Sequence, residues 1–502
     1  TKGKIQFIPV SQGGKLVVGH YIKAGEIYFA GDPSERKSTG SYYTPEYIVD
    51  YIVRNTVGEK LKELKSTFFK EQLPAMEAYK RAVDEDERYS LAVLLEENAL
   101  AFVREKLLDL SFLDPAMGSG HFLVNATNLI SNYFTEILNE IDIQGNLESG
   151  TGYWRRWVVE NCIYGVDLNP LAVELAKLSL WILSMARHQP LSFLNHHFKC
   201  GNSLVGTWLE EIGNFPYSRV KEEIRQLNLF EQDPDFKAAV EEVIAKNSLI
   251  AGKASANLED VREKKEWLEE IDHLLNGYKA LCDVHTNLKI KNSSIDEIQY
   301  AQILQNKDFP LARSLTPEKY FHWELEFPFL LRKNGFDSVI GNPPYVQLQT
   351  MGDMADTFQR LGFDTFTRTG DIYCLFYEQG VRLLRQNGIL AFITSNKWMR
   401  AGYGEALRYF LAEKTNPLVL VDFSGQKIFE SATVDVNILI IEKAKNKNKT
   451  KSCAITNLPS INNLSIFIEQ HKSITGFKTK QSWAILRDIE QRIKEKIEAV
   501  GV

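Results

Sequence analysis

One stretch limits the possible folds of this 502-residue chain more than any other, and it reads Val339-Ile340-Gly341-Asn342-Pro343-Pro344-Tyr345-Val346. The β-branched start is typical of a strand. The two prolines then forbid both a helix and a continued strand, so the chain must leave the strand as a rigid, extended turn. Because ligands bind beyond the carboxyl ends of strands in an open α/β sheet, the sequence predicts a binding site at this turn.

The residue types in this turn indicate the kind of ligand. Asn342 offers a side-chain carbonyl acceptor, Pro343 offers a main-chain carbonyl held at a fixed angle, and Tyr345 adds a flat aromatic face. Two acceptors and a stacking surface suit a planar heterocycle with an exocyclic NH2 group, such as a flipped-out adenine. The alternative is a tight exit from a strand, because Asn and Pro are ordinary turn residues. The rest of the chain favours the binding site.

Bulk composition excludes several classes of protein. Hydrophobic residues make up 44% and charged residues 25%, which is typical of soluble globular proteins. We find no apolar run long enough to span a bilayer and no signal-peptide pattern, so a cytoplasmic location is the default expectation. The five cysteines lie far apart without Cys-x-x-Cys spacing, and we interpret them as reduced structural thiols. A net charge of -6 argues against a wholly basic nucleic-acid-coating protein, but it allows a local basic groove.

A second candidate element begins near residue 40. Tyr43-Thr44-Pro45 is followed by apolar residues on one helical face, which predicts a helix with Thr44 as its cap and Pro45 at its first position. A helix N-terminus also presents free N–H groups to a carboxylate. The local pattern does not decide between a plain cap and a ligand site.

A strand, a glycine-containing turn and a helix are predicted between residues 110 and 130. The strand Leu110–Leu113 leads into Asp114-Pro115-Ala116-Met117-Gly118-Ser119-Gly120. This order is how α/β sheets bring main chain against a cofactor, and Gly118 and Gly120 allow an approach that a Cβ would block. We interpret His121 as a helix-start residue without a catalytic role.

Two further strand ends carry polar side chains. Asp167 ends the strand 162–167, where an acidic residue is placed to accept both hydroxyls of a ribose. Asn202 follows the next strand, where its side chain could read an adenine edge, although Gly201-Asn202 is also an ordinary turn. Asn202 and Asn342 lie about 140 residues apart, too far for one crossover. The helix-rich part from 218 to 289 predicts an inserted helical hairpin, and we interpret its charges as a solvated face.

Five motifs occur in one order: "YYTPEYIV", "FLDPAMGSGHFLV", "YGVDLNPLAVELAKLSLW", "GNSL" and "VIGNPPYV". Over about residues 35 to 445 the chain resembles the gamma class of S-adenosylmethionine-dependent DNA amino-methyltransferases, and most of all the methyltransferase part of type IIG restriction-modification and related phage-defence enzymes. The family usually has Asp where this chain has Asn202. The resemblance implies two sets of site residues and no metal. The cofactor-binding set is Tyr43, Thr44, Asp114, Pro115, Ala116, Gly118, Asp167, Leu168, Asn202 and Ser203, and the catalytic set is Asn342, Pro343, Pro344, Tyr345 and Phe429.

The resemblance also implies an activity. The expected enzyme moves a methyl group from S-adenosyl-L-methionine to the 6-amino group of a flipped adenine in double-stranded DNA, by positioning and electrostatics. Two alternatives stay open. Glutamine methyltransferases acting on release factors also use Asn-Pro-Pro-Tyr, and the chain could be a cofactor-binding scaffold without catalysis.

The fold expected is α/β, a Rossmann-like methyltransferase sheet flanked by helices and carrying a helical insertion. Family members have a target-recognition domain after the catalytic core, and many have a nuclease before it. We expect the first to be missing at the C-terminus. Glu35-Arg36-Lys37 matches a nuclease Glu-x-Lys only superficially, because Asp32 is too close to be its partner carboxylate. The expected units are a small β element (1–40), the cofactor-binding half (41–215), the helical insertion (216–316), the catalytic half (317–455) and a helical linker (456–502).

Overall fold

The computed structural model describes residues 11–12, 15–16, 43–145, 147, 150–185, 193–213, 215–216, 233–291, 295–429, 434–455, 464–477, 480–485, 490, 493 and 496. Within the predicted β element of residues 1–40, the structure describes two short strands only. They are β1 (Ser11–Gln12) and β2 (Lys15–Leu16), which pair antiparallel. The nuclease-like Glu35-Arg36-Lys37 lies outside the described residues. In the part that is described, no helix is long and apolar enough to cross a membrane.

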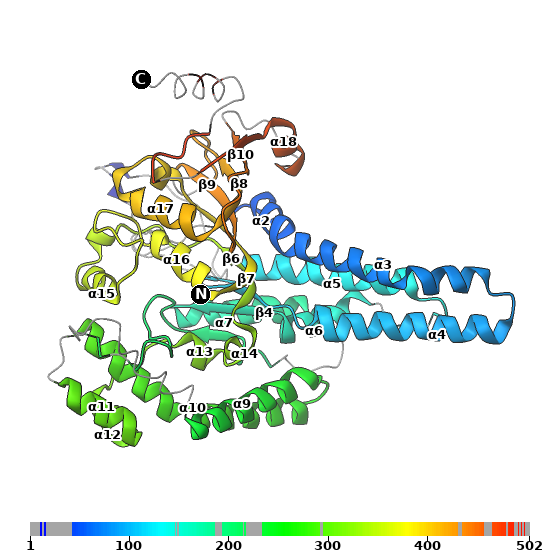
Figure 1. The fold of residues 1–502 in the computed structure, drawn as a ribbon, viewed down its shortest axis with the longest axis horizontal. Helices are drawn as coiled ribbons and strands as arrows, with labels where there is room; N and C mark the ends of the chain where they lie inside the picture. Colours follow the sequence, from blue (N-terminus) through cyan, green and yellow to red (C-terminus); the bar gives the residue numbers. More distant parts are fainter. Residues whose placement is uncertain are drawn as a thin grey trace, which may run out of the picture.

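A nine-stranded sheet forms the centre of the molecule, in the order β11-β10-β8-β9-β7-β6-β3-β4-β5 (Figure 1). The run β5-β4-β3-β6-β7 is parallel and has the 3-2-1-4-5 order of doubly wound α/β folds. The antiparallel strand β9 lies between β7 and β8. The predicted α/β fold is therefore confirmed. The strands are β3 (Phe112–Asp114), β4 (Ile163–Asp167), β5 (Phe198–Cys200), β6 (Phe336–Gly341), β7 (Leu384–Ser395), β8 (Asn416–Asp422), β9 (Val436–Glu442), β10 (Thr450–Ala454) and β11 (Ser473–Thr475).

Alternating residues of the central strands pack into two separate cores. Ile340 and Ile440 belong to the core on one face, whereas Val339 and Leu439 belong to the core on the other. Successive side chains of a strand point to opposite faces, so a sheet covered on both sides needs the continuous apolar runs that these strands have. The first face is covered by α2 (Glu46–Val53), α3 (Glu59–Arg81), α4 (Glu85–Phe102), α5 (His121–Ile141), α6 (Thr151–Asn161) and α7 (Pro170–Leu183).

Shorter helices cover the second face. They are α13 (Trp323–Glu326), α14 (Leu330–Lys333), α15 (Asp353–Leu361), α16 (Tyr373–Leu383) and α17 (Glu405–Lys414). A further helix, α18 (Leu464–His471), packs beside α2. The sheet continues beyond β8, because β10 pairs with β8 and β11 pairs with β10. The hydroxyls of Thr450 and Ser452 are buried and bond to Pro417 O and Thr475 Oγ1, so β10 lacks the apolar alternation that marks a strand.

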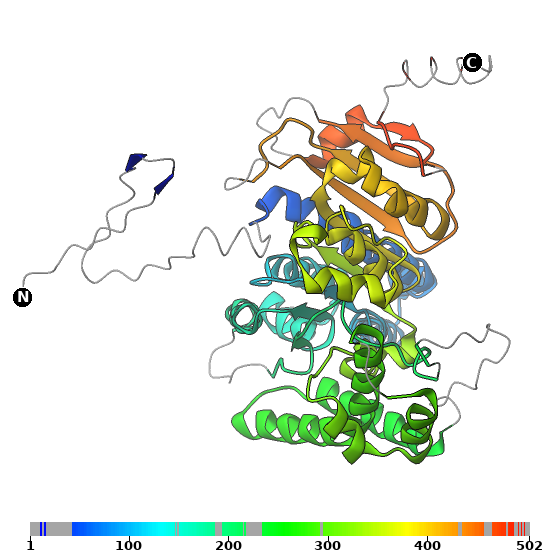
Figure 2. The ribbon, with the colours of Figure 1, turned by 90° about the vertical axis from the view of Figure 1, so that its left-hand side faces the viewer.

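The predicted helical insertion is confirmed and has a core of its own. Figure 2 shows it in green at one end of the molecule, with β8 to β10 at the other. Its charges are not all solvated, which corrects the sequence interpretation: Lys264 is fully buried, and its Nζ lies 2.7 Å from Glu160 Oε2 of α6. This ion pair ties the insertion to the sheet domain. The insertion helices are α9 (Pro234–Gly252), α10 (Leu258–Ile290), α11 (Glu297–Asn306) and α12 (Phe309–Leu315).

Candidate active site

Four neighbouring strand ends bring the predicted site residues to one edge of the sheet. β5, β4, β3 and β6 are parallel neighbours, so the residues that follow them share this edge. Asp114 ends β3, Asp167 ends β4, Asn202 follows β5 and Asn342 follows β6. Residues more than 200 positions apart in sequence thus lie together because β6 inserts beside β3.

The turn between β3 and α5 folds tightly over the sheet edge. Asp114 is buried, and its Oδ1 accepts a hydrogen bond from Ala116 N at 3.0 Å. Gly118 and Gly120 have φ values of +52° and +83°, which L side chains rarely adopt. A Cβ on Gly120 would lie 3.1 Å from Ala176 Cβ of α7, so this glycine also allows α5 and α7 to approach each other. The chain therefore presents main chain, without side-chain cover, at the position where the sequence predicts a cofactor.

Asp167 joins this turn to the end of β4. Its Oδ2 accepts from Gly118 N at 2.9 Å, and its Oδ1 accepts from Asn169 N at 2.8 Å. Burial raises the pKa of Asp167, and the two N–H donors oppose that shift. Each carboxylate oxygen keeps a second lone pair, so the side chain can still accept ribose hydroxyls. The next residue, Leu168, is 69% exposed and presents an apolar face beside it.

The turn after β5 is braced against the turn after β3. Ser203 Oγ donates to Pro115 O at 2.6 Å, and Trp323 Nε1 donates to Ser203 O at 3.0 Å. Asn202 Oδ1 accepts from Leu204 N at 3.0 Å, so Asn202 makes the ordinary turn that the sequence left open. Its oxygen retains one lone pair for a ligand.

Thr44 contacts the Asn-Pro-Pro-Tyr turn directly. Asn342 Nδ2 donates to Thr44 Oγ1 at 3.1 Å, and Thr44 is 4% exposed. The predicted role of Thr44 as a helix cap is wrong: Pro45 is the cap residue, its carbonyl accepts from Ile48 N, and the cap makes no side-chain hydrogen bond. The short Thr44 hydroxyl points to Asn342 instead. This contact joins segments 298 residues apart.

Aromatic rings surround the Asn-Pro-Pro-Tyr turn. Tyr345 Oη donates to Ile393 O at 3.1 Å, which fixes the phenol against β7. Its ring lies edge-on to Tyr373 with centroids 5.9 Å apart, and the ring of Phe429 is 6.1 Å away. Phe429 is itself buried. On the other side of the site, Tyr43 is exposed and stacks on His121 at 4.9 Å.

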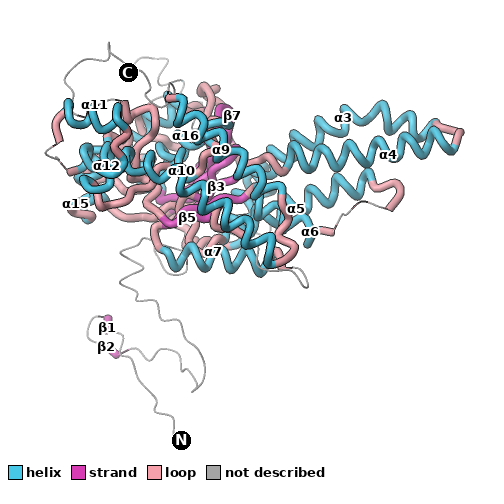
Figure 3. Tube along the Cα trace, turned by 90° about the horizontal axis from the view of Figure 1, so that it is seen from below, coloured by secondary structure: helices cyan, strands magenta, loops and turns pink. Residues whose placement is uncertain are grey.

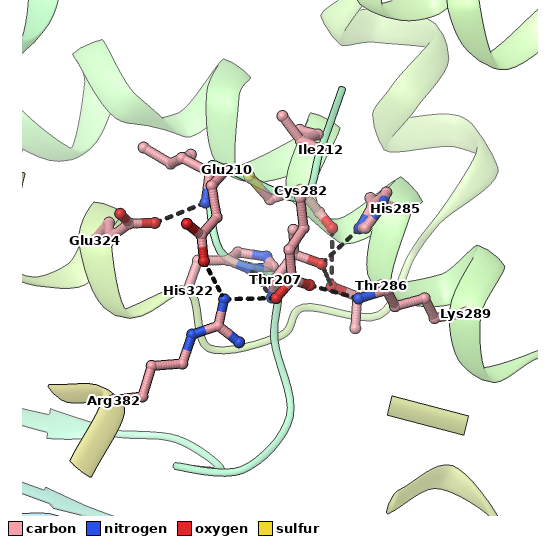
Figure 4. Close-up of polar contacts among 12 residues, drawn as sticks. Thr207, Glu210, Ile212, Cys282, His285, Thr286, Lys289, His322, Glu324 and Arg382 are labelled. Carbon is pink, nitrogen blue, oxygen red and sulfur yellow. Dashed lines mark hydrogen bonds and ion pairs between the residues drawn. The ribbon is translucent and has the colours of Figure 1, made fainter. Parts of the chain in front are cut away.

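A buried polar network that sequence reasoning missed holds the loop after β5 (Figure 4). Thr207 N donates to His322 Nδ1 at 3.1 Å, and His322 Nε2 lies 2.9 Å from Asp283 Oδ1. Thr207 Oγ1 lies 2.9 Å from His285 Nδ1 of α10. Leu209 N donates to Glu324 Oε2. These partners come from α10 of the insertion, from α13 and from His322 directly before α13, and no sequence spacing connects them. The insertion therefore positions the loop that carries Asn202 and Ser203.

Comparison with known proteins gives matches across the chain. The model of the Eco57I restriction-modification methylase family matches residues 161–429, and that of the MmeI DNA-methyltransferase domain matches residues 91–216. A putative type II restriction enzyme and methyltransferase of Methanocaldococcus jannaschii is 25% identical over 82% of this chain and 36% of its own length. The adenine-specific methyltransferase BrxX of Escherichia coli is 22% identical over 80% of this chain and 30% of its own length.

Solved structures match with low similarity. The type IIL restriction-modification enzyme MmeI, solved in complex with DNA, has a TM-score of 0.44 and 13% identity over 89% of this chain and 41% of its own. The chain spans about a third of the length of the curated relatives described above. Because the first family model matches more than half of the 502 residues, the chain belongs to the Eco57I restriction-modification methylase family.

Proposed function

We propose that this chain is the catalytic core of a DNA methyltransferase, which moves a methyl group from S-adenosyl-L-methionine to the 6-amino group of an adenine flipped out of double-stranded DNA. It would serve as the modification part of a restriction-modification or phage-defence system. The observation that carries the proposal is the 3.1 Å contact between Asn342 Nδ2 and Thr44 Oγ1. This contact supports the proposal because a direct transfer requires the motif that would hold the base to lie beside the segment that would hold the cofactor.

The residues at the sheet edge fit S-adenosyl-L-methionine. Asp167 would accept the ribose hydroxyls, and the exposed Leu168 would pack on the cofactor adenine. The main chain around Gly118 and the buried carboxyl of Asp114 would hold the methionine part. A Cβ on Gly118 would meet nothing within 4 Å, so the turn has room beside it. When bound, the cofactor supplies an electrophilic methyl group on a sulfonium.

The catalytic motif would act on the amino group of the target base. Because the nitrogen of the Asn342 amide donates to Thr44, its oxygen lies on the other side and can accept from a base amino group. The Pro343 carbonyl would be the second acceptor. Both oxygens favour positive charge on the amino nitrogen, which grows as the new bond forms. Tyr345, with Phe429 beside it, would stack on the base.

The relatives support the substrate and the wider partners. Their names are a putative type II restriction enzyme and methyltransferase and an adenine-specific methyltransferase, and this chain spans only about a third of the length of each. We therefore propose that further segments, among them a target-recognition domain and in some members a nuclease, act together with this core. A flipped base costs a few kcal/mol of unstacking, which contacts from a recognition domain would offset.

The acceptor class can be tested with radiolabelled S-adenosyl-L-methionine. Duplex DNA of mixed sequence and a release factor would be offered separately to the chain joined to a target-recognition domain, with the Asn342→Ala variant as the background. Label on DNA alone supports the proposal. Label on the release factor would support the glutamine methyltransferase alternative, and cofactor binding with no transfer to either acceptor would support a non-catalytic scaffold.

Asp167→Ala is expected to weaken S-adenosyl-L-methionine binding by about 1.5–3 kcal/mol, the scale for hydrogen bonds to a charged group. The variant also removes the acceptor for Gly118 N and Asn169 N, so both turns would loosen. Calorimetric titration measures the loss. Asp109→Ala is the matched control, since that carboxylate is exposed and pairs with Lys333 away from this edge. Unchanged affinity in Asp167→Ala would remove this residue from the site.

Cofactor affinity is expected to rise with pH between about 6 and 7.5. Burial raises the pKa of Asp114 to about 8. The hydrogen bond from Ala116 N–H lowers this pKa, and the nearby charge of Asp167 raises it. Asp114 therefore carries a proton at pH 6 and must lose it to pair with the ammonium group of the methionine part. Affinity should increase up to about tenfold per pH unit in this window. Asp114→Asn should flatten the dependence, and a slope that survives in this variant would contradict the role of Asp114.

A further inference from the structure

A cavity of about 640 Å³ lies at the edge of the sheet opposite the proposed active site. Its lining includes Tyr164 at the start of β4, His197 directly before β5 and Lys333 shortly before β6, whereas the proposed active site follows the other ends of these strands. Helix α9 of the insertion forms one wall. Seen from the insertion, α9 and α10 lie over the strand region of the sheet domain (Figure 3). The volume is within the usual range of small-molecule sites.

Two buried histidines line this cavity with ring nitrogens that make no hydrogen bond. His196 is 7% exposed and His197 is 5% exposed. Neither ring nitrogen of His196, nor Nδ1 of His197, has a hydrogen-bond partner among the described residues. Burial lowers the pKa of both imidazoles, so each ring is neutral and offers one N–H donor and one acceptor. Because buried polar atoms are nearly always hydrogen-bonded, these nitrogens indicate a polar partner from outside the chain.

Aromatic rings surround the two histidines. The ring centroids of His196 and His197 are 4.0 Å apart, and Tyr164 lies 3.9 Å from His197 and 4.9 Å from Phe329. Phe329 and Trp157 of α6 line the cavity and are partly exposed. Aromatic surface suits a planar ring that can stack on it. Neutral imidazoles can donate to and accept from the polar edge of such a ring, so the interior favours a heterocycle over a hydrocarbon.

The charged lining residues favour a ligand with negative charge. Arg104 and Arg332 are exposed and form no ion pair with any residue that the structure describes, and Glu105 is the lining carboxylate left without one. Free guanidinium groups therefore outnumber free carboxylates, and a guanidinium binds phosphate through two parallel hydrogen bonds. The other charged lining residues belong to the ion pairs Lys333–Asp109 and Lys279–Glu326.

We propose that this cavity is a second ligand site, which takes a planar heterocycle carrying a phosphate, the chemistry of a purine nucleoside monophosphate. The base would stack on Trp157 and Phe329 and hydrogen-bond to His196, and the phosphate would reach Arg332. Because the walls come from both the sheet domain and α9, a bound nucleotide would link the insertion to the sheet. The site lies away from the proposed methyl transfer and does not depend on it.

Calorimetric titration of the full chain with AMP and with GMP tests the proposal. Saturating S-adenosyl-L-homocysteine would be present, so that the proposed cofactor site cannot take up the nucleotide. We expect at least one nucleotide to bind with a Kd below about 1 mM. Its nucleoside and inorganic phosphate should each bind at least about tenfold more weakly, because each lacks half of the contacts. Binding of neither nucleotide, equal binding of inorganic phosphate, or binding of a single-stranded oligonucleotide alone would overturn the proposal.

A pair of tryptophan variants on α9 locates the bound nucleotide. Ala251 lines the cavity, whereas Ala245 on the same helix is exposed and lies outside the lining. Ala251→Trp should fill the cavity and weaken nucleotide binding by about tenfold or more. Ala245→Trp should bind like the parent protein, and thermal melts of both variants would confirm that they fold. Equal nucleotide affinity in the two folded variants would overturn the proposal.

Two polar variants test the contacts inside the cavity. Arg332→Gln should weaken nucleotide binding about tenfold and leave nucleoside binding unchanged. His196→Phe keeps a ring that can stack on Phe193 and removes both nitrogens, so it should also weaken binding about tenfold. Its melting temperature without ligand should equal or exceed that of the parent, because no buried nitrogen then lacks a partner. A lower melting temperature with unchanged nucleotide affinity would show a structural histidine and overturn the proposal.

Discussion

Asn342→Ala is expected to slow methyl transfer roughly a hundredfold or more, the scale for losing one acceptor that acts on charge developing in a transition state. Cofactor affinity should change little, because Asp114, Asp167 and the Gly118 turn stay in place. The loss should therefore fall on the rate of the chemical step. Single-turnover transfer assays at saturating cofactor, with binding measured separately, report the two quantities.

Two conservative variants test the hydrogen bonds that hold Asn342 and Tyr345 in place. Thr44→Val removes the acceptor of the Asn342 amide and keeps the side-chain shape, so it should slow transfer by up to about tenfold. Tyr345→Phe keeps the stacking ring but loses the bond to Ile393 O, so its effect should be mild. A Thr44→Val enzyme as slow as Asn342→Ala would mean that the contact itself, and not the Asn342 oxygen, carries the rate.

Gly341→Ala is expected to damage both stability and cofactor binding. A Cβ at this position would lie 2.6 Å from Asp114 Oδ1, and the backbone φ of +157° is one that side chains rarely adopt. Overpacking of this kind costs about 1–3 kcal/mol of folding free energy. Displacement of the Asp114 carboxyl should also weaken S-adenosyl-L-methionine binding by about tenfold or more, because about 1.4 kcal/mol corresponds to a tenfold change in affinity.

Gly152→Ala is the matched control for this experiment, because a Cβ there would meet nothing within 4 Å. Thermal melts and calorimetric titrations of the two variants should differ clearly. If Gly341→Ala melts and binds like the parent protein, then β6 and the Asp114 turn do not touch as closely as described. The proposed arrangement, in which the base site lies against the cofactor site, would then fail.

The strand ends were predictable because each carries its own signal. Glycines after Asp114, an acidic residue at the end of β4 and two prolines after Asn342 all follow apolar runs, and parallel strands place such ends at one edge. The helical insertion was predictable from its length and its polar, helical periodicity. These features depend on residues that are close together in the sequence, so a single sequence is enough to predict them.

Contacts between distant segments were not predictable. Thr44 looked like a helix cap, yet its hydroxyl accepts from Asn342, and nothing near residue 44 indicates that pairing. The Thr207, His322 and Asp283 network joins three segments without a common spacing. Strand β10 was not predicted, because its sequence resembles a polar loop. Its buried Ser452 hydroxyl instead forms a hydrogen bond with the hydroxyl of Thr475 on β11. In each case tertiary packing, and not local preference, decides the structure.

Mass spectrometry of nucleosides from treated DNA tests transfer to the 6-amino group of adenine most directly. Duplex DNA would be incubated with S-adenosyl-L-methionine carrying a deuterated methyl group and with the chain joined to a target-recognition domain, then digested completely. We expect deuterated N6-methyldeoxyadenosine, which should be lost with Asn342→Ala. Label on cytosine alone, or none on DNA while the cofactor binds normally, would contradict transfer to this amino group.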